Sequence, residues 1–206
     1  MGFYADQILP RGVNWAMAGK EFRKTRPLAT EGLHGEVLEL GFGSGLNLPH
    51  YPDAVTRILA ADPAKVGRKL AAKRLAACPI PVDFVELHDG RLRLPDASVD
   101  AILSTWTLCT VPDVQRVLAD LRSVMRPGGT LHFLEHGLSP DPKVAKWQHR
   151  LNGVQQRFCG GCQLNVAMDE MIRGAGYEIE ALDNFHMCGG PKFATYLYSG
   201  RARSST

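Results

Sequence analysis

The stretch that decides the fold is Glu36-Val-Leu-Glu-Leu-Gly-Phe-Gly-Ser-Gly45. A short apolar run carries one acidic residue, Glu39, and then gives way to glycines at alternate positions, Gly41, Gly43 and Gly45. A run of this length that ends in glycines predicts a buried parallel strand followed by a tight loop. Because glycine lacks a Cβ, such a loop can adopt positive φ and let a flat ligand lie against bare backbone. We therefore expect the first strand and the ligand-binding loop of a doubly wound α/β domain.

The loop differs from two common nucleotide-binding motifs. Leu46 stands where the dinucleotide fingerprint needs Gly or Ala, and no Gly-Lys-Ser/Thr follows that would form a phosphate-binding loop. The spacing of Glu39 and the three glycines instead resembles the first motif of the class I S-adenosylmethionine (SAM) methyltransferases. An acid beside the loop suits SAM, which carries a sulfonium and an ammonium group. A plain glycine turn after a buried strand is the alternative.

The resemblance implies a fold and a set of ligand contacts. It implies an α/β, Rossmann-like class I methyltransferase fold, with a seven-stranded, mostly parallel sheet and helices on both faces. It also implies that Glu39 and the three glycines meet the methionine and ribose parts of SAM. A nicotinamide-dependent oxidoreductase is a weaker alternative, since Leu46 breaks the fingerprint that such enzymes use.

Length, charge and cysteine content bound the remaining possibilities. The chain has 206 residues, which suits one domain with a sheet-centred core. A net charge of +3 does not by itself indicate a nucleic-acid partner. Five cysteines without disulfide-like spacing predict reduced thiols and a cytoplasmic location. We expect no signal peptide and no membrane span, because no apolar run approaches about 18 residues. Arg201 and Arg203 are expected in a frayed tail.

The second strand is expected over residues 57–62 and ends in Asp62. In nucleoside-binding doubly wound folds an acid at this place accepts hydrogen bonds from ribose hydroxyls, for which a carboxylate offers two oxygens. Asp62-Pro63 also begins a helix well, here expected over residues 64–77, so a helix cap is the alternative role. We place both Asp62 and Pro63 in the cofactor site.

Two later strand ends complete the cofactor site that the resemblance implies. A third strand is expected over residues 82–86, and Asp89-Gly90 after it matches the acid that meets the adenine amino group; an ordinary turn is the alternative. The fourth strand, residues 99–104, leads into Thr105 and Trp106 at the edge where parallel sheets bind ligands. Thr105 is expected near the methionine part and Trp106 on adenine, unless the indole fills a sheet–helix interface.

The fifth strand carries the catalytic candidate. An amphipathic helix over residues 113–126 and Arg-Pro-Gly-Gly129 precede a strand over 130–135, a pattern that resembles the same family. The strand ends in Glu135-His136, at the end that faces the transferred methyl group in this fold. His136 is the candidate general base, because imidazole exchanges a proton near neutral pH. Glu135 is expected to orient it or to contact substrate. A hydrogen-bonded strand end without a chemical role is the alternative.

We divide the chain into residues 1–34, an N-terminal helical lid segment, and residues 35–206, the SAM-dependent methyltransferase domain. The lid is expected to hold one or two helices broken near Pro10-Arg11-Gly12 and to bring Tyr4 to the substrate. An insertion over about 138–164 is expected to wall the acceptor pocket with Trp147. A helix, a strand over 177–182 and a final strand over 192–199, antiparallel by resemblance, complete the sheet.

Cys159-x-x-Cys162 allows two functional readings. Together with His186 and Cys188 it would supply four zinc ligands, and alone it would be a redox pair. The His-x-Cys spacing is unusual for zinc, and the pair does not follow a first strand as in thioredoxin-like folds. We therefore expect no metal and a glycine turn with small buried thiols.

The chemical class of the methyl acceptor is implied only by a narrower resemblance. Glu135-His136 and Gly-Gly-Cys162-x-Leu resemble the small methyltransferase-like branch (methyltransferase type 11 domain), which includes thiol S-methyltransferases and soluble relatives. This implies in-line transfer of the methyl group of SAM to a small molecule, on a thiol or on a phenol- or quinol-type oxygen or carbon, with S-adenosylhomocysteine as product. A SAM-binding module without turnover is the alternative. We expect no nucleic-acid partner, and a monomer or homodimer.

Overall fold

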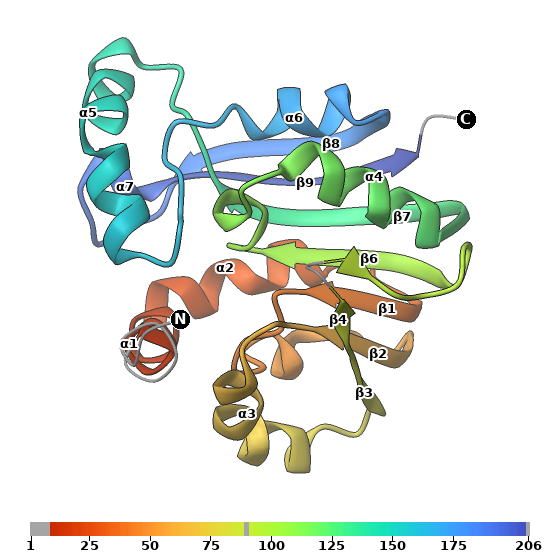
Figure 1. The fold of residues 1–206 in the computed structure, drawn as a ribbon. Coiled ribbons are helices and arrows are strands. Elements are labelled where there is room, and N and C mark those ends of the chain that lie inside the picture. Colours follow the sequence, from red (N-terminus) through yellow and green to blue (C-terminus); the bar gives the residue numbers. More distant parts are fainter. Residues whose placement is uncertain (1–8, 89–90, 205–206) are drawn as a thin grey trace.

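The computed structural model describes residues 9–88 and 91–204 and is built on one seven-stranded sheet (Figure 1). The strand order is β3-β2-β1-β6-β7-β9-β8. The strands are β1 (Gly35–Leu40), β2 (Val55–Ala61), β3 (Val82–Val85), β6 (Val99–Thr105), β7 (Met125–His136), β8 (Tyr177–His186) and β9 (Tyr196–Ser204). Neighbouring strands from β3 to β7 pair in parallel, whereas β9 is antiparallel to both β7 and β8. The predicted seven-stranded sheet with an antiparallel last strand is confirmed.

Helices cover both faces of the sheet because its central strands are apolar on both sides. The helices are α1 (Leu9–Met17), α2 (Lys20–Thr30), α3 (Lys65–Ala77), α4 (Val114–Val124), α5 (Pro142–Phe158), α6 (Met168–Gly174) and α7 (Lys192–Thr195). Successive residues of a strand point to opposite faces. Leu38 accordingly joins the core that contains Leu118 of α4, and Val37 joins the core that contains Ala29 of α2.

The N-terminal helices divide at a different place from the one expected. The predicted break near Pro10-Arg11-Gly12 is wrong, because α1 runs through these residues and ends at Met17. A proline in the first turn of a helix replaces an N–H group that has no intrahelical partner there, so it does not interrupt the helix. The division lies instead at Ala18-Gly19, between α1 and α2.

The C-terminal strand begins later and runs further than expected. Residues 192–195 form the short helix α7, and β9 extends from Tyr196 to Ser204, so the predicted boundaries of 192–199 are wrong. The expectation of a frayed tail at Arg201 and Arg203 is also wrong. Both residues pair with β7 and β8, and both guanidinium groups form ion pairs with Glu180. Cross-strand opposite charges of this kind stabilise a sheet.

Two smaller features complete the fold. Strands β4 (Leu87–His88) and β5 (Arg91–Leu92) form a separate antiparallel pair. The predicted insertion contains α5, which stands beyond the sheet next to α7 (Figure 1). Over residues 9–88 and 91–204, no helix combines the length and the apolar character needed to cross a bilayer.

Candidate active site

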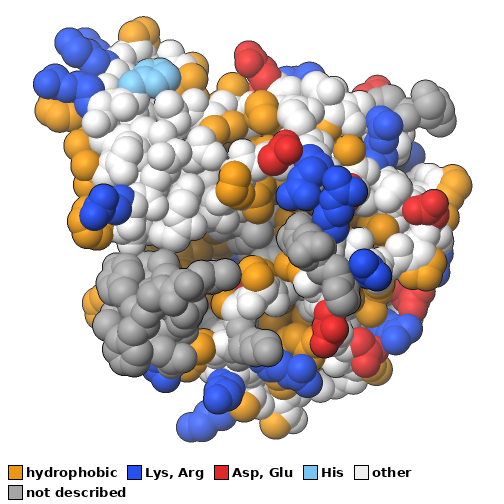
Figure 2. Space-filling model, in the orientation of Figure 1, with side chains coloured by type: hydrophobic (Ala, Val, Ile, Leu, Met, Phe, Trp, Pro, Cys, Tyr) orange, Lys and Arg blue, Asp and Glu red, His pale blue; other side chains and the backbone are white. Residues whose placement is uncertain are grey.

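The candidate site lies where the central parallel strands end. β6 lies between β1 and β7, with Leu40 of β1 paired to Ser104 and Thr105 of β6 paired to Leu134 of β7. The glycine loop and the segments after β6 and β7 therefore leave the same edge of the sheet, the ligand-binding edge of doubly wound folds. In Figure 1 this edge faces the side on which α1 and α5 stand, and Figure 2 shows the molecular surface hollowed on that side.

The glycines of the loop have different surroundings. Gly41, Gly43 and Gly45 all have positive φ, at 74°, 54° and 70°. A Cβ on Gly41 would collide with the side chain of Thr107, and a Cβ on Gly45 would lie 3.0 Å from Leu48. A Cβ on Gly43 would meet nothing closer than the Gly41 carbonyl oxygen, at 3.8 Å. Gly41 and Gly45 thus permit internal packing, while Gly43 leaves space open beside the loop.

A buried carboxyl lies directly beneath the loop. Glu39 is 1% exposed and accepts hydrogen bonds from the Asn47 amide at 2.8 Å and from the Tyr51 hydroxyl at 2.7 Å. The same Asn47 amide donates to Thr105 Oγ1 at 2.9 Å. Burial raises the pKa of Glu39 to about 7, although the bonds from Tyr51 and Asn47 favour its ionised form. Near neutral pH a nearby charge therefore changes the ionised fraction of the Glu39 carboxyl.

Helix α2 supplies a buried cation to the same network. Arg26 is 4% exposed and donates a hydrogen bond of 2.6 Å from Nη1 to Asn47 Oδ1. Its guanidinium carbon lies 4.9 Å from the centre of the Trp106 ring, within the range of a cation–π contact. Burial lowers the pKa of Arg26 to about 10. Arg26, Asn47 and Tyr51 were not predicted; the spacing of the buried residues of α2 signals a packed face but not a charge.

Asp62 contacts both the loop and the helix after it. Its Oδ2 accepts from the Gly43 N–H at 2.7 Å, and its Oδ1 accepts from the Ala64 N–H at 2.6 Å, just before α3. Burial raises the pKa of Asp62, while these two backbone bonds oppose the shift. Each carboxylate oxygen keeps a further lone pair. Asp62 therefore makes the contact with the start of the helix that was the alternative to ribose binding. Its oxygens can still accept hydrogen bonds from a ribose. Pro63, next in the chain, is exposed.

Trp106 combines backbone strain with an unpaired donor. Its φ is +50°, an uncommon value for a bulky residue and one that tends to occur at functional sites. Its ring packs edge-on against Phe22 of α2, with centroids 5.3 Å apart, and against Arg26. The buried Nε1–H has no hydrogen-bond partner among the described residues. These contacts place the indole against α2, and its buried donor lacks the partner that such groups normally have, as far as the described residues go.

Glu135 is fully buried and its carboxylate is surrounded by donors. It accepts from Ser104 Oγ at 2.7 Å and from the backbone N–H groups of Thr107, Leu108 and Cys109 at 3.1, 3.1 and 3.2 Å. Burial raises its pKa, while these hydrogen bonds favour the ionised form. With four donors on its oxygens, Glu135 holds the segment after β6 in place. This favours a positioning role over substrate contact.

His136, the last residue of β7, lies beside two thiols. Its Nδ1 is 3.3 Å from Cys162 Sγ, which is 3.7 Å from Cys109 Sγ. The hydrogen bond from Cys109 and the contact with His136 lower the pKa of Cys162 to about 5, and the pKa of Cys109 is raised well above its usual value. Cys162 is buried but Cys159 is exposed, so the expectation of two buried thiols is wrong for Cys159.

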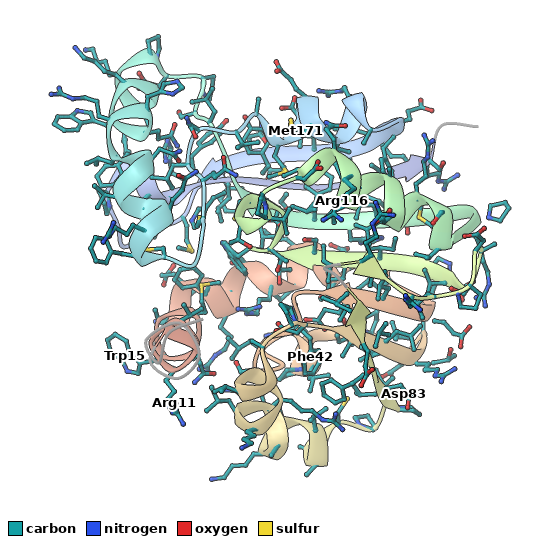
Figure 3. The ribbon with its side chains drawn as sticks, viewed as in Figure 1. Arg11, Trp15, Phe42, Asp83, Arg116 and Met171 are labelled. Atoms are coloured by element: carbon teal, nitrogen blue, oxygen red, sulfur yellow. The ribbon has the colours of Figure 1, made fainter. Side chains whose placement is uncertain are left out.

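The remaining predicted residues lie apart from this centre or outside the described chain. Trp147 of α5 is half-exposed and has the Arg150 guanidinium over its ring at 5.4 Å. Tyr4, Asp89 and Gly90 lie outside the described residues. Figure 3 shows Arg11 and Trp15 of α1 projecting away from the sheet, and the Trp15 side chain is 82% exposed.

Comparison with known proteins places this geometry in a family. The family model described as a methyltransferase domain matches residues 38–133, which contain the glycine loop, Asp62, Trp106 and most of β7. In this part of its sequence and in its strand order, the chain is similar to the class I SAM-dependent methyltransferases.

Curated relatives and solved structures agree with this assignment. The chain is 33% identical over 139 residues to thiol S-methyltransferase TMT1B of Homo sapiens, covering 65% of this chain and 57% of the relative. It is 32% identical over 132 residues to human thiol S-methyltransferase TMT1A, covering 62% and 54%. The chain thus spans little more than half of these relatives. A SAM-dependent methyltransferase from Thermotoga maritima shares the fold, with a TM-score of 0.67, 18% identity, and 98% and 100% of the two chains covered.

The residues at the strand ends fit SAM, the cofactor of this family. The open side of Gly43 is a cradle that a Cβ would fill, and the Trp106 Nε1–H is a donor without a partner in the part of the chain that the structure describes. Glu39 and Asp62 place two carboxyl groups beside the glycine loop, where they favour a cationic ligand. Gly43, Asp62 and Trp106 would hold the cofactor, with Glu39 beneath them.

Proposed function

We propose that this protein transfers the methyl group of SAM to a small molecule, and that the acceptor atom is a thiol sulfur. The observation that carries the proposal is the open side of Gly43 above the buried Glu39 carboxyl, at the edge where β1, β6 and β7 end. The thiol acceptor is supported by the similarity to proteins named thiol S-methyltransferases.

The residues of the chain act on the cofactor chiefly by charge and shape. When bound, SAM supplies a methyl group on a cationic sulfur, which makes the methyl carbon electrophilic. Glu39 and Asp62 favour that positive charge, and burial strengthens the interaction because the local dielectric constant is low. Gly43 offers backbone that no side chain blocks. Arg26 lowers the pKa of Glu39 and so keeps part of this carboxyl ionised.

The acceptor side depends on alignment more than on acid–base chemistry. In-line displacement needs the two reacting atoms held about 3 to 3.5 Å apart, and such positioning supplies several kcal/mol of rate enhancement. A thiol is already partly ionised near neutral pH, so it needs little help from a base. His136 is the candidate base for an oxygen or carbon acceptor.

The test has a binding stage and a transfer stage. Calorimetry with SAM, S-adenosylhomocysteine and NADH should give heat for the first two ligands only. Incubation with SAM and a panel of small thiols, phenols and quinols should then give methylated thiols, detected by mass spectrometry. Absence of SAM binding by well-folded protein would contradict the proposal as a whole. Binding without transfer to any member of the panel would favour a SAM-binding module without turnover.

The His136→Asn variant separates thiol from oxygen chemistry. With a thiol acceptor, and with both proteins freed of metal by a chelator, the variant should keep the shape of the wild-type rate profile between about pH 6 and about pH 9, because no general base is needed. Selective loss of the neutral-pH rate with a phenol acceptor would assign the base role to His136. Equal loss with every acceptor would instead indicate that His136 positions the site.

A further inference from the structure

Two thiols and one imidazole converge at the end of β7. Cys109 Sγ, Cys162 Sγ and a ring nitrogen of His136 all lie within 4.8 Å of one another. The residues come from three separate segments, namely the turn after β6, the last position of β7 and the loop between α5 and α6. His186 and Cys188, which the zinc interpretation set aside in the sequence analysis would have paired with Cys162, are not in this cluster.

The surrounding backbone is built to bring Cys162 onto Cys109. Gly160 and Gly161 both have positive φ, at 64° and 88°, and turn the chain sharply after α5. A Cβ on Gly161 would lie 3.0 Å from the Thr110 carbonyl oxygen, so only glycine fits closely there. The Gln163 N–H donates to the Cys109 carbonyl at 2.8 Å, which ties the two cysteine-bearing segments together.

Two of the three ligand-to-ligand distances match those that a metal ion would impose, and the third is no more than 4.8 Å. A tetrahedral Zn²⁺ with Zn–S bonds of about 2.3 Å holds two sulfurs about 3.8 Å apart, and it holds a sulfur and an imidazole nitrogen about 3.5 Å apart. The observed distances are 3.7 Å between Cys109 Sγ and Cys162 Sγ and 3.3 Å between Cys162 Sγ and His136 Nδ1. Two thiolates would also neutralise the charge of the ion, which a buried site requires.

We propose that Cys109, His136 and Cys162 bind a zinc ion, with the fourth coordination position open to the sulfur of the acceptor. Among the described residues the cluster has three protein ligands, the number found in catalytic rather than structural zinc sites. The open position would lie on the side of His136, which is the last residue of β7 at the ligand-binding edge of the sheet. The acceptor role rests on the proposed function, whereas the metal site does not.

The bound metal would select and activate a thiol. Coordination of an R–SH group forms a Zn–S bond and releases the thiol proton to solvent, so the sulfur keeps a lone pair as a metal thiolate. Glu135 would support the site, because its carboxylate accepts from the Cys109 N–H at 3.2 Å and fixes the backbone that carries this ligand.

The test begins with metal binding by the full chain. Reduced protein freed of metal by dialysis against a chelator should bind about one equivalent of Zn²⁺ in a competition titration. Co²⁺ in its place should give the intense near-ultraviolet absorption of thiolate-to-cobalt charge transfer. Cys162→Ser and His136→Asn should each weaken Zn²⁺ binding at least about tenfold. Cys159→Ser, at an exposed thiol of the same loop, is the matched control and should bind like wild type.

Circular dichroism and thermal melting show whether each variant folds. His136→Asn, at a partly buried position, provides a second test of the metal site if the cysteine variants lose their fold. Wild-type protein that binds no stoichiometric zinc, or folded Cys162→Ser and His136→Asn variants that bind it as tightly as wild type, would overturn the metal site. Thiol methylation at full rate by zinc-free protein would overturn the acceptor role alone. Zinc binding with SAM binding but no thiol methylation would contradict the proposed function and leave the metal site standing.

Discussion

The Arg26 guanidinium donates a hydrogen bond of 2.6 Å to the side-chain oxygen of Asn47, 21 residues further along the chain. Through the amide of Asn47 this contact reaches both Glu39 of β1 and Thr105 of β6. The N-terminal helix α2 is therefore coupled by buried polar groups to the two strands that carry the candidate site. Buried networks of this kind are costly to leave partly satisfied.

Removing the cation of this network should weaken both the fold and cofactor binding. Arg26→Met leaves Asn47 Oδ1 without its donor and removes a charge that favours ionised Glu39. We expect a loss of about 2 to 3 kcal/mol in the free energy of unfolding, measured by urea denaturation. The Kd for SAM should rise about tenfold. Arg23→Met, on the same helix with an exposed side-chain contact to Ala18, should change stability by less than about 0.5 kcal/mol; equal effects at both positions would contradict the network.

The carboxyl of Glu39 should make stability depend on pH in a predictable direction. Its pKa of about 7 lies above the ordinary value of 4.5, so between these values the folded protein holds a proton that the unfolded chain releases. This contribution is fully present below pH 4.5 and is lost as the pH rises through about 7. Its size is about 3 kcal/mol.

Glu39→Gln isolates this contribution from other titrating groups. Burial lowers the pKa of His132 to about 4. Its contribution to the unfolding free energy therefore grows as the pH rises from about 4 to about 6.5, which is opposite to the contribution of Glu39. The difference in unfolding free energy between wild type and Glu39→Gln should therefore shift against the wild type as the pH rises from about 5 to about 8. Urea denaturation across this range measures the difference, and parallel curves for the two proteins would contradict the prediction.

Glu135 should prove to be a positioning residue. Glu135→Gln keeps the shape but replaces one acceptor oxygen with an amide N–H₂ group, which then faces the donors of Ser104 and of residues 107–109. We expect a loss of about 2 to 4 kcal/mol in unfolding free energy. Amide hydrogen exchange at residues 107–109 should accelerate. Glu36→Gln, at a partly exposed ion pair with Arg126, should cost about 1 kcal/mol or less. Unchanged exchange in Glu135→Gln would leave its carboxylate free for a substrate role.

Two alanine substitutions in the glycine loop should separate packing from ligand binding. Gly41→Ala should prevent stable folding, because the new Cβ collides with Thr107 at a φ of +74°. Gly43→Ala should cost only about 1 to 2 kcal/mol of stability, the price of a left-handed alanine, since its Cβ meets no atom within 3.8 Å. Its Kd for SAM should nevertheless rise at least about tenfold. Folded Gly43→Ala protein with wild-type affinity would show that the cofactor does not use this side of the loop.

Local patterns in the sequence were enough to predict the main strands and helices of the fold. The apolar run before Gly41 and the amphipathic stripe of α4 each depend on residues close in the chain, whereas Arg126-Pro-Gly-Gly129, expected to precede the fifth strand, lies inside β7. Periodicity and turn chemistry of this kind fix the type of an element because the backbone geometry repeats over a few residues. The resemblance carried by these motifs then implied seven strands, mostly parallel, with an antiparallel last strand. The predicted boundaries are wrong where tertiary pairing extends a strand, as in β9.

The contacts that distinguish the site join residues far apart in the chain. Arg26 meets Asn47 across a turn of the fold, and Cys109 meets Cys162 across 53 positions. No local pattern encodes these pairs, because they depend on how helices and loops pack over the sheet. The same packing turns Trp106 toward α2 and surrounds Glu135 with donors. Sequence alone therefore determined the fold and the cofactor loop, while only the packed structure decided which polar groups meet at the strand ends.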